Sequence, residues 1–256
     1  MGATMGMLPR GYAVSLRTLV IGAAGLLATA CATVDVPEPD LAPRAPHTIS
    51  FMESGDPTPA PSGFDDMCRR SVAVCLGALY PGQSVVINVS TQAKPVVLTP
   101  EALALLQKVN QDVNTRIHSV SDKVAHGVEE LWIDPLAPRL MDASFTAPGD
   151  CEDFAIAKRD ELRASGWPAD AMFLAVGYHR RAGLHVALIV RTTQGDLVLD
   201  SRSPWIRSWN DTPYIWTKRQ LAGNSTAWVK PYATSPELKV LTAAIEARAR
   251  GGTAAR

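Results

Sequence analysis

Three residues that together can cleave an amide bond lie in order along this 256-residue chain: Cys151, His185 and Asp200. Cys151 stands where a turn-forming run, Pro148-Gly149-Asp150, changes into a helical pattern. The free N–H groups and the dipole at a helix start favour a thiolate. His185 lies in an apolar stretch typical of a strand, and Asp200 ends the next such stretch. A nucleophilic thiol, a base and a carboxylate that orients the base predict a hydrolase with an activated thiol.

The pairing of the two strands decides whether His185 and Asp200 share a face of the sheet. Residues 192–195 read Thr-Thr-Gln-Gly, which we interpret as a four-residue hairpin loop. Arg191 then pairs with Asp196, and the histidine and aspartate become diagonal neighbours with Cα atoms roughly 7–8 Å apart. A slip of one residue would place them on opposite faces, so the prediction depends on this loop.

Each of the two partners also has a simpler interpretation. A lone histidine in an apolar strand is more often a hydrogen-bonded core residue, and a lone aspartate at a strand end is more often a cap. Asp196 is a rival for the orienting role, but it follows Gly195 at the hairpin loop, where we expect it to be solvated. The order of His185 and Asp200 on compatible elements favours the catalytic interpretation.

Three carboxylates, Asp150, Glu152 and Asp153, surround Cys151. They argue against a structural thiol in an apolar core, so we expect the Cys151 side chain to be exposed. In the simplest interpretation they complement the helix dipole, each worth about 0.3–1 kcal/mol. The alternative is a calcium site, because Ca²⁺ prefers hard oxygen ligands, although the spacing is not that of an EF-hand loop.

The composition argues against a polyanion partner. Lys and Arg total 25, as do Asp and Glu, so the formal net charge is zero. Nucleic-acid binding usually needs a clear basic excess, and we expect no such partner. The sequence contains no Gly-rich phosphate loop, no zinc-type cluster and no internal repeat.

Residues 1–31 have the organisation of a secretory signal. Arg10 and Arg17 precede an apolar run over residues 19–28 that ends in small residues. This run is shorter than the roughly 20 apolar residues of a membrane-spanning helix. Residues 26–31 also resemble a bacterial lipoprotein box, in which Cys31 is the lipidated residue, with simple release as the alternative. Either outcome predicts a periplasmic protein. If Cys31 is lipidated, we expect the lipid anchor to be its only contact with the membrane.

The rest of the chain divides into three parts. Residues 32–62 are rich in Pro, Ala and acidic residues and predict a disordered tether. Residues 63–235 are long enough for one domain with a real core. Residues 236–256 are interpreted as a C-terminal helix and tail.

Within that domain the pattern is helical first and extended later. Thr99 and Pro100 begin a helix whose apolar spacing continues to about His118. A second helix over 151–165 is followed by three strands, at 172–178, 184–191 and 196–200. This order predicts an α+β fold, with helices packed on an antiparallel sheet.

Cys68 and Cys75 are plausible disulfide partners in an exported protein. The alternative is a pair of buried thiols on a short helix. Seven residues of straight helix span about 10 Å, which is too far for a disulfide. The disulfide therefore requires a break between the two cysteines.

At these residues the chain resembles the bacterial transglutaminase-like cysteine proteinases. The hallmark is the stretch from Gly149 to Ala155, and the partner residues lie in 183–188 and 197–200. Glu130-Leu131-Trp132 matches a further family block, and 65–70 with Cys75 matches the paired cysteines of an alphaproteobacterial subgroup. The resemblance extends over about 64–230.

The resemblance implies a papain-like, transglutaminase-like core with Cys151 as nucleophile, His185 as base and Asp200 as orienter. It implies a protein or peptide substrate such as a large surface adhesin, and a membrane-bound regulator. The acidic residues beside the cysteine would bind calcium. For the oxyanion hole, the N–H of Cys151 and the side chains of two asparagines are candidates. The calcium ligands are Asp150, Glu152 and Asp153, and the asparagines are Asn110 and Asn114.

Two other functions stay open on the sequence. The same fold could transfer an acyl group to an amine or cleave an amide of peptidoglycan. It could also serve as a non-catalytic, calcium-responsive binding module. Fast alkylation of Cys151 near pH 6 would favour either enzyme over the binding module.

Overall fold

A computed structural model shows how the chain folds. It describes residues 49–75, 93–137, 142–231, 243–245 and 247. The predicted signal segment 1–31, with Cys31, lies outside these residues, as does most of the predicted tail 236–256. In the described part of the chain no helix is both long enough and apolar enough to cross a membrane.

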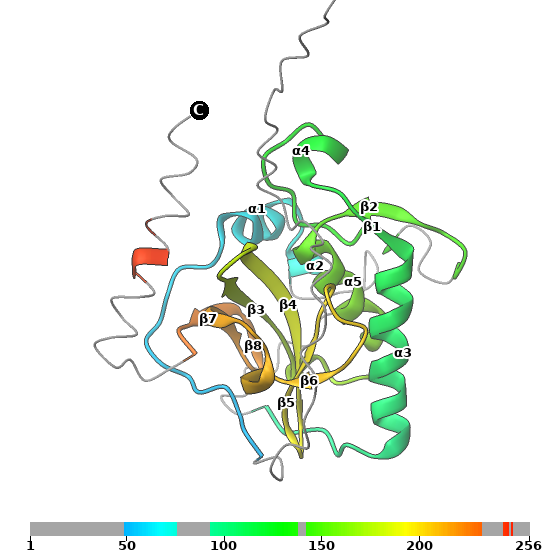
Figure 1. The fold of residues 1–256 in the computed structure, drawn as a ribbon, viewed down its shortest axis with the longest axis vertical. Helices are drawn as coiled ribbons and strands as arrows, with labels where there is room; N and C mark the ends of the chain where they lie inside the picture. Colours follow the sequence, from blue (N-terminus) through cyan, green and yellow to red (C-terminus); the bar gives the residue numbers. More distant parts are fainter. Residues whose placement is uncertain (1–48, 76–92, 138–141, 232–242, 246, 248–256) are drawn as a thin grey trace, which may run out of the picture.

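Six antiparallel strands form the central sheet, in the order β6-β5-β4-β3-β7-β8 (Figure 1). Helix α5 packs against β4 and against helix α3. The predicted α+β class, with helices on an antiparallel sheet, is confirmed. The elements are α3 (Pro100–Arg116), α5 (Cys151–Ala164), β3 (Met172–His179), β4 (Gly183–Thr192), β5 (Gly195–Leu199), β6 (Arg207–Ser208), β7 (Ile215–Leu221) and β8 (Asn224–Val229).

Helix α3 begins as its sequence predicts. The Thr99 hydroxyl accepts a hydrogen bond from the Ala102 N–H. Pro100 occupies the first turn, where its missing N–H costs no hydrogen bond within the helix. The helix ends at Arg116, whose guanidinium forms a largely buried ion pair with Glu161 of α5. This pair ties the two helices together beside the sheet.

Two short strands that the sequence pattern does not indicate lie between the two long helices. After α3 the chain forms β1 (Ile117–Ser119), which pairs in parallel with β2 (Ala147–Gly149). Between them lies the short helix α4 (Asp122–Ala125). The β1–β2 pair leads the chain into Asp150 and the start of α5, so it fixes where that helix begins.

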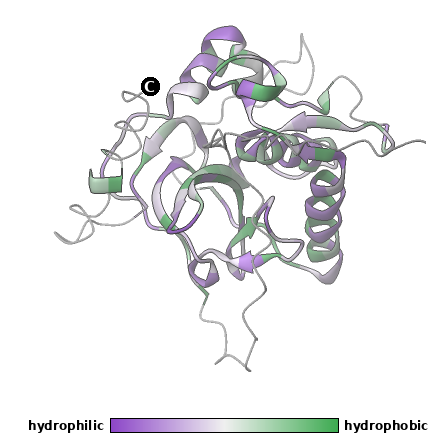
Figure 2. Cartoon of the chain, turned by 45° about the horizontal axis from the view of Figure 1, so that its top comes forward, coloured by the Kyte–Doolittle hydropathy of each residue, from purple (hydrophilic) through white to green (hydrophobic). Residues whose placement is uncertain are grey.

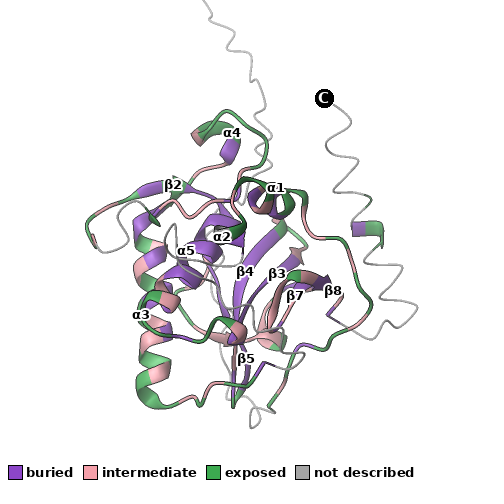
Figure 3. Cartoon of the chain, turned by 180° about the vertical axis from the view of Figure 1, so that it is seen from behind, coloured by how far each residue is buried: buried purple, intermediate pink, exposed green. Residues whose placement is uncertain are grey.

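Both faces of the sheet are buried, as alternation along each strand allows. One face packs with α3 and α5 through Leu174, Val176, Val186, Leu188 and Val190. The other face gathers Phe173, Ala175, Ala187, Ile189, Val198, Tyr214 and Trp216 around Met52. Figure 2 shows the central strands mainly in the hydrophobic colour, and Figure 3 shows them buried, while the outward side of α3 is exposed.

The prediction of a disordered tether over 32–62 is wrong for residues 49–61, which pack against the sheet. Met52 is buried, its N–H donates to the Asp196 carboxylate at 2.7 Å, and Arg219 donates to the Met52 carbonyl at 2.9 Å. Pro57 forms a β-bridge with Val229. Residues 49–61 therefore belong to the domain. Their composition looks disordered because backbone groups, rather than an apolar pattern, make most of these contacts.

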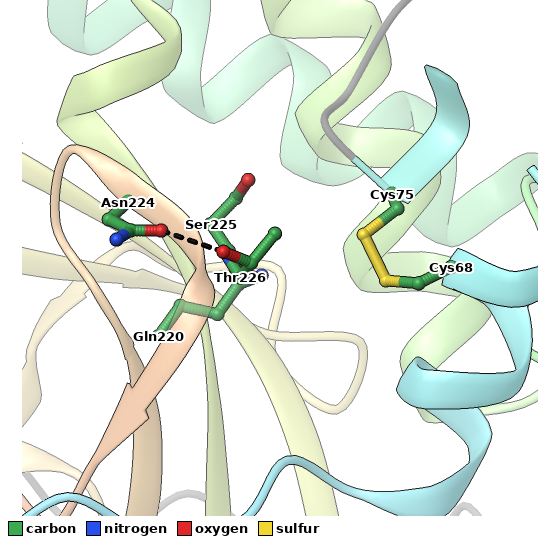
Figure 4. Close-up of a disulfide and its surroundings, with 6 residues drawn as sticks. All are labelled: Cys68, Cys75, Gln220, Asn224, Ser225 and Thr226. Carbon is green, nitrogen blue, oxygen red and sulfur yellow. Dashed lines mark hydrogen bonds between the residues drawn. A yellow bond between two sulfur atoms is a disulfide. The ribbon is translucent and has the colours of Figure 1, made fainter. Parts of the chain in front are cut away.

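Cys68 and Cys75 form a disulfide, drawn in Figure 4. Helix α1 (Ser62–Arg70) ends at Ser71, whose backbone is extended, and α2 (Val72–Cys75) follows. This is the break that the disulfide requires, because it brings the two Cα atoms to 4.7 Å.

Lys158 is an unusual residue inside the helix layer. It is fully buried on α5, and among the described residues its ammonium nitrogen has no hydrogen-bond partner. The nitrogen lies 5.9 Å from the centre of the Phe154 ring. Burial lowers the pKa of Lys158 to about 7, against a smaller opposing effect of the Asp200 charge. The folded state therefore carries the cost of a desolvated ammonium at and below neutral pH.

We expect Lys158→Met to stabilise the protein most at pH 6. The unfolded lysine keeps its proton up to about pH 10.4, so between pH 7 and that value the unfolded state binds the extra proton. The free energy of unfolding of the wild type should then rise by about 1.4 kcal/mol per pH unit, and the advantage of the variant should shrink by the same amount. Thermal melts from pH 6 to 9 measure this, with exposed Lys94→Met as the control. A less stable Lys158→Met at pH 6 would show that the ammonium makes a favourable contact.

Candidate active site

Cys151 is the first residue of α5, with Asp150 at the N-cap. The Asp153 carboxylate accepts a hydrogen bond from the Asp150 N–H at 3.3 Å, which closes the start of the helix. The prediction of an exposed side chain is wrong, because Cys151 is only 5% exposed and packs in the core cluster of the helix layer. The three neighbouring carboxylates are buried as well. Glu152 Oε2 even lies 3.3 Å from the Cys151 sulfur, so these carboxylates do not keep the cysteine at the surface.

His185 and Asp200 meet as the strand pairing predicts. Leu188 pairs with Leu199 and Arg191 with Asp196, which is the predicted register. The turn itself is tighter, because Thr192 and Gly195 also pair. His185 Nε2 and Asp200 Oδ1 are 2.7 Å apart, and His185 is fully buried.

Asp200 is held as a carboxylate by several donors. Burial works to raise its pKa, but the His185 charge and three hydrogen bonds outweigh burial and hold the pKa well below its usual range. These bonds come from His185 Nε2, from the Arg202 N–H at 2.9 Å and from the Tyr214 hydroxyl at 2.7 Å. A permanently ionised Asp200 can orient the imidazole and stabilise its protonated form.

Tyr214 was not assigned a role from the sequence. Its ring stacks on that of His185, with centres 5.1 Å apart, while its hydroxyl donates to Asp200. Burial, followed by the Asp200 charge, raises the Tyr214 pKa, so the phenol stays protonated as a donor. Tyr214 directly precedes β7, and only the sheet order, which sets β7 beside β3, brings it to this site.

The second ring nitrogen of His185, Nδ1, has no hydrogen bond to any described residue, although it is buried. Because Nε2 faces Asp200, Nδ1 is the atom that can exchange a proton with a thiol or a leaving group. Cys151 belongs to α5, which packs on the strand that carries His185. Cys151 and His185 therefore belong to two elements in direct contact.

Asn110 and Asn114 do not stand free as donors. Asn110 Nδ2 donates to the Ser203 carbonyl at 2.9 Å, and Asn114 Nδ2 donates to the Asp200 carbonyl at 3.0 Å. Both side chains thus fasten the segment after β5 to α3. Their amide protons are committed to the backbone that positions Asp200, which differs from the predicted oxyanion role.

A cluster of buried carboxylates lies beside the start of α5. Asp122, Asp150 and Glu152 each offer one oxygen, and these oxygens lie within 4.8 Å of one another. The Asp122 N–H approaches Asp150 Oδ2 at 3.4 Å. The predicted metal ligand Asp153 is not part of this set, because its carboxylate accepts from the N–H groups of Ile133 and Asp150. Asp122 is the third member of the set, and the sequence analysis did not single it out.

The electrostatics of this cluster call for a cation. Burial, followed by the Asp150 charge, raises the pKa of Asp122 to about 6. Burial together with Asp150 raises the pKa of Glu152 well above its usual range. Burial also raises the pKa of Glu130, to which the charges of Asp150 and Asp122 contribute. In the described part of the chain, Asp122 Oδ1 and Asp150 Oδ1 are buried without a hydrogen-bond partner. Crowded hard oxygens with unused lone pairs fit a divalent cation such as Ca²⁺.

A sequence model of the bacterial transglutaminase-like cysteine proteinases matches residues 54–235, well over half of the chain. The chain belongs to this family. As a member of the bacterial transglutaminase-like cysteine proteinases it is a cysteine peptidase, which agrees with the order of Cys151, His185 and Asp200.

A comparison with solved structures matches this chain to Legionella pneumophila LapG. The calcium-bound structure is 23% identical, with a TM-score of 0.42, and the match covers 63% of this chain and 84% of LapG. The EGTA-treated structure is 20% identical, with a TM-score of 0.41, over 62% of this chain and 84% of LapG. Among curated proteins, no match is found.

Proposed function

We propose that this family member is an exported peptidase that cleaves peptide bonds of a protein substrate with Cys151, His185 and Asp200. The observation that carries the proposal is the His185–Asp200 pair. One imidazole nitrogen is engaged by an ionised carboxylate, and the other is open in the strand against which α5 packs. A purely structural histidine would satisfy both ring nitrogens.

The residues divide the reaction between them. His185 Nδ1 takes the proton of reduced Cys151, and the thiolate attacks the peptide carbonyl carbon. His185 then gives that proton to the leaving amine as the carbon–nitrogen bond breaks, leaving a thioester. Water, deprotonated by His185, attacks the thioester, and the released thiolate recovers its proton. Asp200 stays ionised throughout and keeps the imidazole in the tautomer that works.

The oxyanion of each tetrahedral intermediate needs donors. The N–H of Cys151 is the candidate that the fold supports, because the first N–H groups of a helix have no intrahelical partner. Asn110 and Asn114 contribute indirectly in this proposal, since they hold the Asp200 backbone in place.

We also propose that the acidic cluster binds calcium. Asp122, Asp150 and Glu152 would hold the ion, and Asp153 would support them by fixing the N–H of Asp150. A bound cation would supply charge neutralisation at the start of α5. The proposal rests on the donor set of this chain.

The place of action follows from the terminal segment. Residues 1–31 would direct export to the periplasm, with Cys31 as the lipid-bearing residue if the segment is processed as a lipoprotein signal. The substrate would then be a periplasmic or surface protein, such as an adhesin, and a membrane-bound regulator would have access to the enzyme.

Replacing Cys151 tests the proposed reaction. With the wild type kept reduced, we expect rapid iodoacetamide labelling at Cys151 near pH 6 and hydrolysis of an unfolded protein such as casein. Cys151→Ala should lose both, and the size-matched Cys151→Ser should be equally inactive, with melting temperatures within a few degrees of the wild type. The side chain is small, so its truncation leaves only a small cavity.

Three results would redirect the proposal. Full hydrolysis by Cys151→Ala would remove this residue from the chemistry. A collapsed melting temperature in both variants would make it a structural cysteine. Labelling without hydrolysis, together with incorporation of a primary-amine probe into protein, would favour the acyltransferase alternative.

A further inference from the structure

A pocket with basic walls opens at the turn between β3 and β4. Its volume is about 350 Å³, and it is lined by His179, Arg180, Arg181, Pro213 and Ile215. Arg180 and Arg181 are exposed, and neither forms an ion pair with another described residue. The volume is within the range of pockets that hold a small ligand or one side chain.

The pocket adjoins the proposed catalytic pair through one aromatic residue. The His179 ring meets the Tyr214 ring edge-to-face, with centres 6.1 Å apart. Tyr214 in turn stacks on His185 and donates to Asp200. Pro213 and Ile215, the apolar part of the lining, are the chain neighbours of Tyr214. Only the Tyr214 ring would therefore separate a group bound in the pocket from His185 and Asp200.

A third arginine lies near this pocket without lining it. Arg202 follows Asp200 by two positions and is half-buried. Its charge acts on both Tyr214 and His179. Burial lowers the pKa of His179, and the charges of Arg202 and Arg181 lower it further. Arg202 therefore adds positive charge beside the pocket, while the exposed Arg180 and Arg181 in its lining are the groups that an anion can reach.

We propose that this pocket is a substrate subsite that binds an acidic side chain, Asp or Glu, of the peptide close to the bond that is cleaved. The proposal rests on the peptidase function proposed above and names the kind of substrate that the site prefers. Arg180 and Arg181 would bind the carboxylate, since a planar guanidinium matches a carboxylate in two-point contact. Arg202 would strengthen the local positive potential. Pro213 and Ile215 would pack against the methylene groups of the side chain.

The charge distribution favours a local recognition site over a general polyanion surface. The formal net charge of the chain is zero, so the three arginines are a local positive excess beside His185 and Asp200. The pocket also combines charge with apolar walls, as a carboxylate on a short aliphatic stem requires.

Cleavage-site profiling tests the proposal on many peptide sequences at once. The reduced wild-type protein digests a denatured proteome, and mass spectrometry counts residues at each position around the cut. We expect Asp and Glu to be enriched at one position. A peptide built on that preference, and its twin with Gln in place of Glu, then give kcat/KM. The wild type should prefer the Glu peptide by tenfold or more.

Variants of the pocket separate recognition from catalysis. Arg180→Gln/Arg181→Gln should lose the Glu preference, and Arg180→Lys/Arg181→Lys should recover part of it. Both residues are exposed, so these changes do not threaten the fold. The charge-reversing variant Arg180→Glu/Arg181→Glu provides a second test. It should reverse the preference at the same position toward Lys and Arg. Arg69→Gln, on the surface of α1, is the control.

The outcomes are distinguishable. Efficient cleavage by the wild type with no acidic preference overturns the subsite and leaves the peptidase function standing. An acidic preference that survives in Arg180→Gln/Arg181→Gln and in the charge-reversing variant also overturns it. No cleavage of any sequence by reduced wild type would refute the peptidase function, and the subsite with it.

Discussion

Asp200→Asn is expected to lower kcat/KM by roughly 10³–10⁴-fold, a loss typical of a triad whose carboxylate is replaced by an amide. Asp200 Oδ1 faces His185 Nε2, and Oδ2 accepts from the Tyr214 hydroxyl. An amide keeps the shape but offers only one acceptor atom. Its NH₂ group would face either the tyrosine hydroxyl or the imidazole, and the proton of His185 would move to Nδ1. That nitrogen could then no longer act as a base toward the thiol.

The measurement is kcat/KM on a cleavable peptide, with melting temperature as the control for folding. Tyr214→Phe is the matched control, because it removes one donor to Asp200 but keeps the ring that stacks on His185. We expect it to cost no more than about tenfold, the scale of one hydrogen bond. His185→Ala should be as damaging as Asp200→Asn, since both remove the working base. Near-normal turnover of either would show that another residue orients or replaces the imidazole.

The register of β4 and β5 was predictable because local sequence determines it. The Thr-Thr-Gln-Gly turn and the alternation of apolar residues leave few ways to pair the strands, and a one-residue slip would expose an entire apolar face. The same local signals identified both long helices: a threonine cap and proline begin α3, and a Gly149-Asp150 turn precedes α5. The pairing of His185 with Asp200 could be predicted because both residues lie at the ends of these well-defined strands.

Contacts between distant segments were not predictable in this way. Asp196 was expected to be solvated beside the hairpin turn, yet it is fully buried and binds Arg191 and the Met52 N–H. Its burial depends on residues 49–61 crossing that edge of the sheet. Nothing in the composition of that segment shows that its backbone would find Asp196 and Arg219 so far along the chain.

The carboxylate cluster shows the same limit at the site itself. Asp150, Glu152 and Asp153 are neighbours in sequence, but the helix start directs Asp153 to the Asp150 and Ile133 N–H groups. The third member, Asp122, comes from α4 because β1 and β2 pair in parallel. A three-residue parallel pair has too little pattern to be recognised from sequence, so the grouping of Asp122 with Asp150 and Glu152 could not be predicted.

Calcium is expected to raise the melting temperature of the wild type, and EGTA to lower its activity. Binding to the native state alone stabilises it by about 2.7 kcal/mol when free calcium is 100 times the dissociation constant. Asp122→Asn, Asp150→Asn and Glu152→Gln should each remove most of this response, because every variant deletes one charged ligand of the cluster. Asp66→Asn, whose carboxylate pairs with Arg69 on the surface, should respond like the wild type.

We also expect the stability order of the wild type and Asp122→Asn to reverse between EGTA and calcium. In EGTA at pH 8, Asp122→Asn should be more stable than the wild type, because it relieves repulsion among three buried carboxylates whose oxygens lie within 4.8 Å. In millimolar calcium the wild type should be the more stable protein, since only it has the full charge that the ion requires. Differential scanning fluorimetry in both buffers, with calorimetric titration of calcium, measures the crossing. If the wild type shows no heat of binding and the same melting temperature and turnover in both buffers, the acids serve only to organise the start of α5 around Cys151.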